Sequence, residues 1–112
     1  MDCLFCKIIN REIPSTVLYE TDEVIAIEDI SPQAPFHVII MPKTHIASPA
    51  DLTEENCHIA GKILLAAAQI AQKEHLDKGY RIVANCGEDG GQTVQHLHFH
   101  MLAKRSLKWP PG

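Results

Sequence analysis

Three histidines alternate with apolar residues in the C-terminal part of this sequence, at His96, His98 and His100. If this stretch is a strand, its two-residue period places the three imidazoles on one face of a sheet and the apolar residues on the other. Imidazoles in such a row can bind a metal, transfer protons near neutral pH, or attack an electrophile to form a covalent intermediate. The row therefore predicts a reactive site, and the three residues alone leave these chemistries open.

A glycine-rich loop at residues 87–93 precedes the histidines. Closely spaced glycines allow backbone N–H groups to surround an anion, and Thr93 adds a hydroxyl group. Most such loops are simple connections, and Glu88 and Asp89 disfavour an anion unless their side chains point away. Beside three histidines, the loop indicates a phosphate-sized ligand.

Two cysteines near the N-terminus, Cys3 and Cys6, have the spacing of half a zinc site. The same spacing occurs in redox motifs and in helices whose two cysteines are unrelated. A thioredoxin-like redox motif follows a strand, and only two residues of this sequence precede Cys3, so we expect zinc rather than redox chemistry. Cys57 and Cys86 have no evident partner in the sequence.

The composition is that of an ordinary globular chain, with 112 residues, 46% of them hydrophobic and 21% charged. We expect one domain over residues 1–112, with a C-terminal tail at 104–112. The net charge of −4 gives no basic surface for nucleic acid, and no apolar run approaches the roughly 20 residues that span a membrane. The N-terminus does not resemble a signal peptide, so we expect a cytoplasmic protein with reduced thiols.

The spacing of apolar residues predicts a short helix at residues 4–10 and a long one from about 54 to 75. We expect Thr53 to cap the start of the long helix, Lys78 and Gly79 to end it, and Trp109 to dock on the domain. Strands grouped around one long helix predict an α+β fold with a mostly antiparallel sheet. The five expected strands are residues 16–19, 24–27, 36–41, 80–85 and 93–103.

The segment from His96 to Leu102 matches the signature of the histidine-triad (HIT) superfamily, in which histidines alternate with apolar residues. In order along nearly the whole chain, the sequence resembles the Hint branch of that superfamily in its bacterial form. The resemblance implies a five-stranded, mostly antiparallel sheet with one long and one short helix, and a homodimer that joins two sheets into ten strands. The other matching segments are Phe5-Cys6-Lys7-Ile8-Ile9, Glu12-Ile13-Pro14, Asp29-Ile30-Ser31-Pro32-Gln33-Ala34-Pro35, Pro42-Lys43-Thr44-His45-Ile46, Lys78-Gly79-Tyr80-Arg81, Gly90-Gly91-Gln92-Thr93-Val94 and Trp109-Pro110-Pro111-Gly112.

The resemblance also implies an activity, that of a purine nucleoside phosphoramidase acting on ligands such as AMP or GMP adducts. Such enzymes hydrolyse the P–N bond of an AMP-amine substrate through a nucleotidyl-histidine intermediate. By position, His98 would be the nucleophile, His100 would donate to the phosphate oxygens, and His37 would support them from a neighbouring strand. Asp29 would bind the ribose hydroxyls, and Asn85 and Thr93 would contact the phosphate and leaving-group region. The remaining expected nucleotide contacts are Phe5, Ile8, Ile27 and Ile30 around the base, together with Gly91, Gln92, Val94 and Trp109.

Bacterial relatives with this cysteine pair bind zinc, and the resemblance implies that His45 and His96 would complete the site with Cys3 and Cys6. A Cys₂His₂ shell has no open position, so the zinc would be structural, and we expect no cofactor in catalysis. Three other functions remain open at this point. They are a dinucleotide polyphosphate hydrolase, against which the Trp109 to Gly112 ending argues, a nucleotide-binding regulatory module with incidental hydrolysis, and a catalytic His₃ zinc hydrolase.

Overall fold

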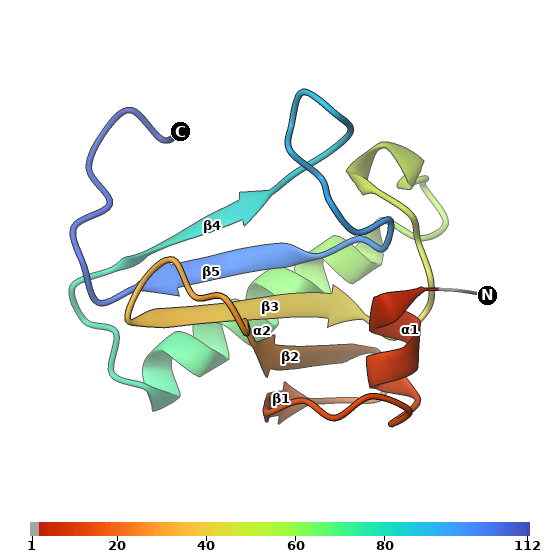
Figure 1. The fold of residues 1–112 in the computed structure, drawn as a ribbon, viewed down its shortest axis with the longest axis horizontal. Coiled ribbons are helices and arrows are strands. Elements are labelled where there is room, and N and C mark those ends of the chain that lie inside the picture. The colour runs from red at the N-terminus through yellow and green to blue at the C-terminus, as the bar shows by residue number, and fades with distance from the viewer. Residues whose placement is uncertain (1–2) are drawn as a thin grey trace.

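The computed structural model describes residues 3–112. Two helices, five strands and one short 3-10 turn follow one another along the chain (Figure 1). None of the helices within residues 3–112 combines the length and apolar character needed to cross a bilayer. The elements are α1 (Leu4–Ile9), β1 (Val17–Glu20), β2 (Val24–Glu28), β3 (Phe36–Pro42), η1 (Pro49–Asp51), α2 (His58–Lys73), β4 (Tyr80–Ala84) and β5 (Phe99–Ala103).

The five strands form one sheet in the order β1-β2-β3-β5-β4, and every neighbouring pair is antiparallel. This confirms the α+β fold and the five-stranded sheet. Strand β5 lies between β3 and β4, with His100 opposite Ile39 and Leu102 opposite His37. His37 and His100 are therefore diagonal neighbours on one face of the sheet, a separation that long side chains can bridge.

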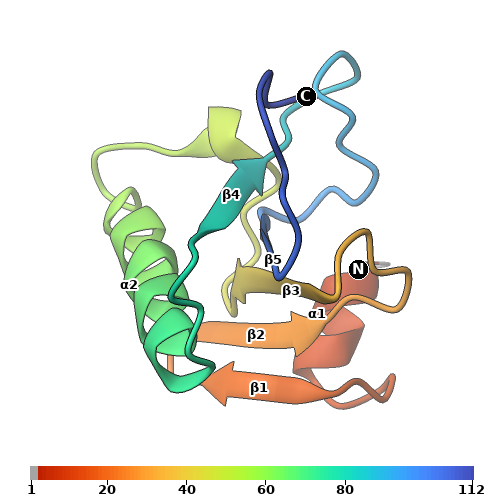
Figure 2. The same ribbon diagram turned by 90° about the vertical axis from the view of Figure 1, so that its left-hand side faces the viewer.

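Each face of the sheet is covered by one helix (Figure 2). The apolar stripe of α2, which includes Ile63 and Ile70, packs on Val24, Val38 and other residues of one face. Helix α1 places Phe5 and Ile8 against Ile25, Ile39 and their neighbours on the opposite face. Because β2 and β3 are buried on both sides, their sequences are continuous apolar runs and do not alternate with polar residues.

The long helix is shorter than the sequence predicts at both ends. Residues 54–57 form turns that lead into the helix. Thr53 caps this segment as expected, because the Thr53 and Asn56 side chains accept each other's backbone N–H groups in a capping box. The regular helix starts later because the N–H groups of Ile59 and Ala60 bond to carbonyls three residues back, at Asn56 and Cys57. The helix begins at His58 and ends at Lys73, after which His75 takes the left-handed conformation (φ 55°). Gly79 has a separate positive φ, so it does not end the helix as expected.

The last strand also starts later than expected, at Phe99 rather than at residue 93. The Leu97 N–H donates to the Ile46 carbonyl (2.6 Å), which draws this segment away from the sheet ladder. Residues 96–98 still point alternately to opposite sides, as predicted, although they are not part of a strand. Leu97 is buried in the core beneath α2, whereas the rings of His96 and His98 lie against Phe5 of α1.

The C-terminal tail does not dock through its tryptophan, since the Trp109 side chain is 82% exposed and the expectation of a buried ring is wrong. The tail is instead held by its backbone. The Arg81 guanidinium on β4 donates to the carbonyl oxygens of Leu107 and Lys108, and more distantly to that of Pro111 (3.5 Å). The tail therefore crosses the outer strand of the sheet on polar contacts alone.

Candidate active site and metal site

The two ring nitrogens of His98 differ in their hydrogen bonding. Its Nδ1 atom lies 2.6 Å from the carbonyl oxygen of His96. A carbonyl can only accept a hydrogen bond, so Nδ1 carries the proton and the Nε2 atom of the neutral ring carries a lone pair. The His98 side chain is buried, and the edge of Phe5 contacts its ring with centroids 5.0 Å apart. This arrangement supplies an oriented, unprotonated nitrogen.

His37 and His100 form a hydrogen-bonded pair whose direction is set by the backbone. The Gln33 N–H donates to His37 Nδ1 at 3.0 Å, so this nitrogen accepts and His37 Nε2 carries the proton. His37 Nε2 lies 2.9 Å from His100 Nδ1 and donates to it. His100 in turn carries its proton on Nε2. We call this chain, from the Gln33 N–H through His37 to His100, the histidine relay.

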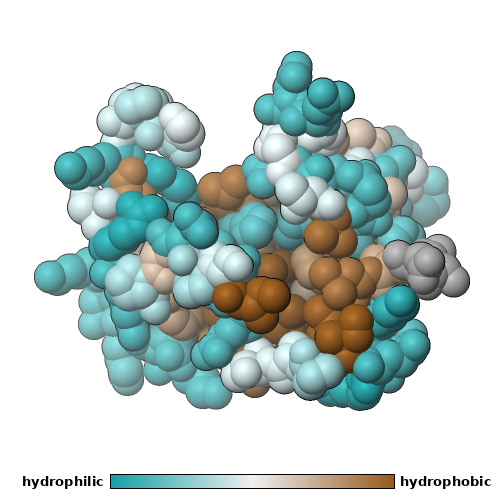
Figure 3. Space-filling view, viewed as in Figure 1, coloured by the Kyte–Doolittle hydropathy of each residue, from teal (hydrophilic) through white to brown (hydrophobic). Residues whose placement is uncertain are grey.

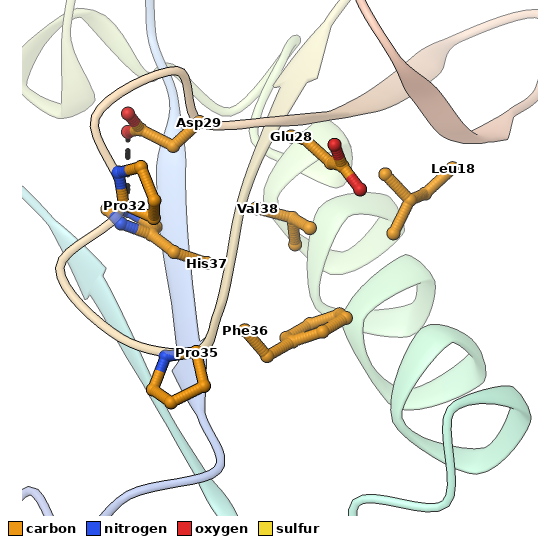
Figure 4. A pocket seen from close by; sticks show the side chains of 8 residues that line it. All are labelled: Leu18, Glu28, Asp29, Pro32, Pro35, Phe36, His37 and Val38. Atoms are coloured by element: carbon orange, nitrogen blue, oxygen red, sulfur yellow. Dashed lines mark ion pairs between the residues drawn. The ribbon is translucent and has the colours of Figure 1, made fainter.

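Asp29 lies beside the relay, at the end of β2. Its Oδ2 atom is 3.4 Å from His37 Nε2 and 3.9 Å from His100 Nδ1, and its Oδ1 atom accepts the Ser31 N–H (2.8 Å). Figure 4 shows the Asp29 carboxylate turned toward the His37 ring at the rim of a hollow of about 180 Å³. The carboxylate is therefore fixed by the backbone at one oxygen and borders the relay with the other.

Burial keeps both relay histidines neutral near pH 7. It lowers the pKa of His37, and the nearby Asp29 carboxylate opposes this shift only in part. Burial also lowers the pKa of His100, with repulsion from His98 and His37 acting in the same direction. Neutral rings are what the relay needs, because a doubly protonated His37 could not accept the Gln33 N–H.

A second cluster brings together Cys3, Cys6, His45 and His96 from three distant parts of the sequence. His96 Nδ1 lies 3.4 Å from Cys3 Sγ, 3.6 Å from Cys6 Sγ and 3.1 Å from His45 Nδ1, and His45 Nδ1 lies 3.4 Å from Cys6 Sγ. Tetrahedral zinc with ordinary Zn–S and Zn–N bonds separates its ligands by about 3.3–3.7 Å. Three of these four distances lie in that range, and the His45–His96 distance is slightly shorter, so the donor atoms are close to the spacing of a zinc site.

The surroundings of this cluster also suit a metal. His96 Nε2 donates to the Pro42 carbonyl (2.8 Å), which leaves its Nδ1 lone pair directed at the other three ligands. Burial lowers the pKa of His96, so the ring is neutral. Burial and the neighbouring Cys3 raise the pKa of the Cys6 thiol, so metal binding must displace its proton. The donor set thus fits the structural zinc that the resemblance implies.

Asp29, His37 and His100 also bring three donor atoms within 4.8 Å of one another, but they do not suit a metal. A histidine that binds a metal donates its other ring N–H to an acceptor, as His96 does. His37 does the opposite, since its Nδ1 accepts the Gln33 N–H and its Nε2 must keep the proton. This arrangement favours a hydrogen-bonded relay over a metal site at these three residues.

The glycine-rich loop is closed on itself and does not form the open anion nest expected from the sequence. The N–H of Gly87 bonds to the Gln92 side chain, that of Gly91 to the Glu88 carbonyl, and that of Gln92 to the Gly87 carbonyl. Gly90 is required here, because a Cβ would lie 2.3 Å from the Cys86 carbonyl oxygen. The Gln92 amide also donates to the Ala47 and Val94 carbonyls, linking the loop to the segment that follows His45.

The expected base-contacting residues fall into two environments. Phe5, Ile8 and Ile27 are buried in the cluster beneath α1, whereas Ile30 is 98% exposed. Apolar side chains gather around α1 on this face of the molecule (Figure 3). A shallow hollow beside Ile30 is lined by Thr16 and Asp29 among others.

The phosphate-region candidates lie on or near the glycine loop. Asn85 and Val94 are half-buried, while Thr93 is exposed. Gln33 and Arg105 make polar contacts that the sequence did not predict, since Arg105 Nε donates to the Gln33 carbonyl and the Gln33 N–H donates to His37. The Gln33 contact to His37 is made by a backbone N–H, which no side-chain pattern reveals.

Comparison with known proteins agrees with this geometry. Residues 2–108 match the family model described as "Scavenger mRNA decapping enzyme C-term binding". The chain is 50% identical over 111 residues to an uncharacterized HIT-like protein of Synechococcus elongatus, covering 99% of this chain and 97% of that protein. It is 45% identical to a 14 kDa zinc-binding protein of Brassica juncea, covering 99% and 100% of the two chains.

A solved structure shares the same fold. The HIT family hydrolase of Legionella pneumophila superimposes with a TM-score of 0.96 at 46% identity, covering 99% of this chain and 100% of that one. The protein therefore belongs to the histidine-triad superfamily, within the family that this model describes.

Proposed function

We propose that this protein is a hydrolase that cleaves the P–N bond of purine nucleoside phosphoramidates, with His98 as the nucleophile. The observation that carries the proposal is the hydrogen bond from His98 Nδ1 to the His96 carbonyl, because it places the proton of the neutral ring on Nδ1 and the lone pair on Nε2. The His98 and His100 rings are adjacent, with centroids 5.1 Å apart, so His100 Nε2 can donate a hydrogen bond to the oxygens of the phosphate that His98 attacks. Naming of similar proteins as HIT family hydrolases supports the general reaction.

The reaction would proceed in two displacements at the α-phosphorus. In the first, His98 Nε2 forms a bond to phosphorus, and the P–N bond to the amine breaks with its electron pair on the amine, which takes a proton from water. In the second, a water molecule attacks phosphorus and loses a proton to the solvent, and the bond from phosphorus to His98 breaks with its electron pair returned to Nε2. Throughout, the His100 Nε2–H would donate a hydrogen bond to the phosphate oxygens. AMP and the free amine are the products, and the relay keeps its protons.

The other residues would bind and orient the nucleotide. Asp29 has free acceptor capacity beyond its bond to Ser31 and would accept hydrogen bonds from the ribose hydroxyls. Asn85 and Thr93 would contact the phosphate and leaving group, with Gly91, Gln92 and Val94 close by. The base would lie near Ile30 against the apolar surface of Phe5, Ile8 and Ile27, and Trp109 would approach the leaving-group side.

We also propose that Cys3, Cys6, His45 and His96 hold a structural zinc ion in this protein. All four positions would be occupied by protein ligands, so the ion would stabilise the fold and take no part in the displacement. Residues 1–112 would act as one domain that pairs with a second copy through β4, which is an outer strand of the sheet. Such pairing would join the two sheets into ten strands.

A second candidate is the cleavage of P–O–P bonds in dinucleoside polyphosphates. The matching family model is named after a decapping enzyme, and an mRNA cap contains such bonds, which favours this candidate. Rates on a fluorogenic AMP-amine phosphoramidate and on a diadenosine polyphosphate distinguish the two. We expect the phosphoramidate to be the better substrate by kcat/KM. A preference for the polyphosphate would select the second candidate, and AMP binding without turnover of either would indicate a binding module.

A further inference from the structure

The loop between β2 and β3 carries the backbone N–H that orients His37, and most of its own contacts are internal. Asp29 N–H bonds to the His37 carbonyl (3.1 Å), Ser31 N–H bonds to Asp29, and the Gln33 side chain donates to the Ser31 carbonyl (2.9 Å). Residues 30–33 are exposed, and only Ala34 of the loop at 30–35 is buried. Few packing contacts therefore hold Gln33 in place.

One hydrogen bond ties this loop to another part of the chain. Arg105 Nε donates to the Gln33 carbonyl at 3.0 Å. Within residues 3–112, it is the sole hydrogen bond between residues 30–35 and any residue outside 29–37. Lys104 makes the contact possible, because its left-handed backbone (φ 70°) turns the chain immediately after β5. Gln33 is thus held from both sides, with its carbonyl on Arg105 and its N–H on His37.

We propose that Arg105 is a positioning residue, which holds Gln33 so that His37 keeps its proton on Nε2, directed at His100. The inference rests on the proposed function for its effect on turnover, but its effect on His37 is independent of any substrate. Without the Arg105 contact, the exposed loop can relax and water can replace the Gln33 N–H at His37 Nδ1. Water both donates and accepts, so it would not select one tautomer of His37. The fraction of protein with a correctly directed relay would then fall.

The side chain at position 105 can be varied so that a donor is kept or removed at the position of Nε, while both variants lose the contact of the guanidinium with the Ser106 carbonyl. In Arg105→Gln, the amide Nε2 lies the same number of bonds from the backbone as Arg Nε, so the hydrogen-bond donor is kept while the charge is lost. In Arg105→Met, a side chain of similar length has no donor. Lys78→Met serves as the matched charge control, since Lys78 lines the same surface hollow as Arg105 and does not bond to the loop.

The direct test is the tautomer of His37, read from ¹⁵N chemical shifts of the imidazole nitrogens in the zinc-bound protein without nucleotide. We expect wild type, Arg105→Gln and Lys78→Met to have His37 protonated at Nε2, and Arg105→Met to show a mixture of both tautomers. An unmixed Nε2 tautomer in folded Arg105→Met overturns the proposal. Equal mixing in Arg105→Gln and Arg105→Met also overturns it, because the donor would then be irrelevant.

The kinetic test uses the fluorogenic phosphoramidate. One exposed hydrogen bond is worth a factor of about 2–10, so we expect kcat of Arg105→Met to fall by that factor with little change in KM, and Arg105→Gln to recover most of it. An equal loss in Lys78→Met would assign the effect to charge and contradict the proposal. If wild type does not turn over the phosphoramidate, the proposed function fails, and the ¹⁵N tautomers still decide the role of Arg105.

Discussion

The Nε2 atom of His37 lies 2.9 Å from the Nδ1 atom of His100, across the β3–β5 pair. The Gln33 N–H on the far nitrogen of His37 gives this hydrogen bond one direction, from His37 to His100. The proton of His100 is consequently on Nε2. A fixed backbone donor thus determines, two rings away, which nitrogen of the relay can serve the reaction.

The first prediction concerns stability against pH. The pKa values of His37 and His100 are lowered from 6.5 in the folded protein, so the unfolded chain binds more protons than the folded one below that pH. The free energy of unfolding should therefore be highest above pH 6.5 and fall as the pH decreases through the lowered pKa values. Thermal unfolding at a series of pH values, with excess zinc throughout, measures this.

Two substitutions test the origin of that pH dependence. His37→Gln removes one of the two buried groups and should flatten the curve below pH 6.5. His75→Gln is the control, because His75 is exposed just after α2 and lies outside the relay. A curve for His37→Gln that is parallel to wild type would show that His37 does not contribute.

The second prediction assigns Asp29 to the ribose. Asp29→Asn keeps an oxygen for the Ser31 N–H but loses the charge that accepts ribose hydroxyls. We expect kcat/KM to fall by about 10- to 100-fold on the ribonucleotide substrate, since hydrogen bonds to charged groups contribute about 1.5–3 kcal/mol. On the same substrate without its 2′- and 3′-hydroxyl groups, wild type and the variant should differ much less, because the hydroxyls that Asp29 would bind are absent. Equal losses on both substrates would place the role of Asp29 at the relay instead.

The third prediction concerns the metal. Protein purified without chelator should contain about one equivalent of zinc, and Cys3→Ala should contain much less. Because zinc binding contributes directly to folding, we expect Cys3→Ala to melt lower by about 10 °C or more. Cys57→Ala provides the control, as Cys57 is exposed and outside the cluster. Sub-stoichiometric zinc in wild type with an unchanged melting temperature in Cys3→Ala would contradict the site.

The fourth prediction concerns the tail. A chain ending at Lys108 keeps the Leu107 and Lys108 carbonyls that Arg81 binds and loses the exposed Trp109. We expect its melting temperature to stay within about 3 °C of wild type, since surface changes are worth about 0.5 kcal/mol. The relative kcat/KM for substrates with different amines should change. Unchanged selectivity would remove Trp109 from the proposed site.

Sequence patterns correctly predicted the elements that do not depend on contacts with distant parts of the chain. The continuous apolar runs of β2 and β3 indicated strands because both of their faces are buried. The start of β5 was wrong because distant contacts decide it, namely the Leu97 bond to Ile46 and the position of His96 in the metal cluster. The start of the long helix was placed too early because the tight turns after Thr53, in which Ile59 and Ala60 bond to carbonyls three residues back, have the same apolar spacing as a regular helix.

For the site, too, local patterns were predictable and distant contacts were not. Alternation identified the three histidines but left several chemistries open, and the resemblance to the HIT superfamily supplied the expected role of each. The directions of their protons did not, because these depend on two backbone groups, the His96 carbonyl and the Gln33 N–H. The contact from Arg105 to Gln33 joins residues 72 positions apart, a separation at which composition and spacing carry no information.

The most direct test of the account is to trap the covalent intermediate. Wild-type protein is mixed with an AMP-amine phosphoramidate, quenched within the first turnover, digested and analysed by mass spectrometry. We predict a nucleotidyl group on His98 and none in His98→Ala, whose turnover should fall by at least about 10³-fold while AMP binding persists. A nucleotidyl group on His100, or turnover of His98→Ala close to that of wild type, would contradict the assignment of His98 as the nucleophile.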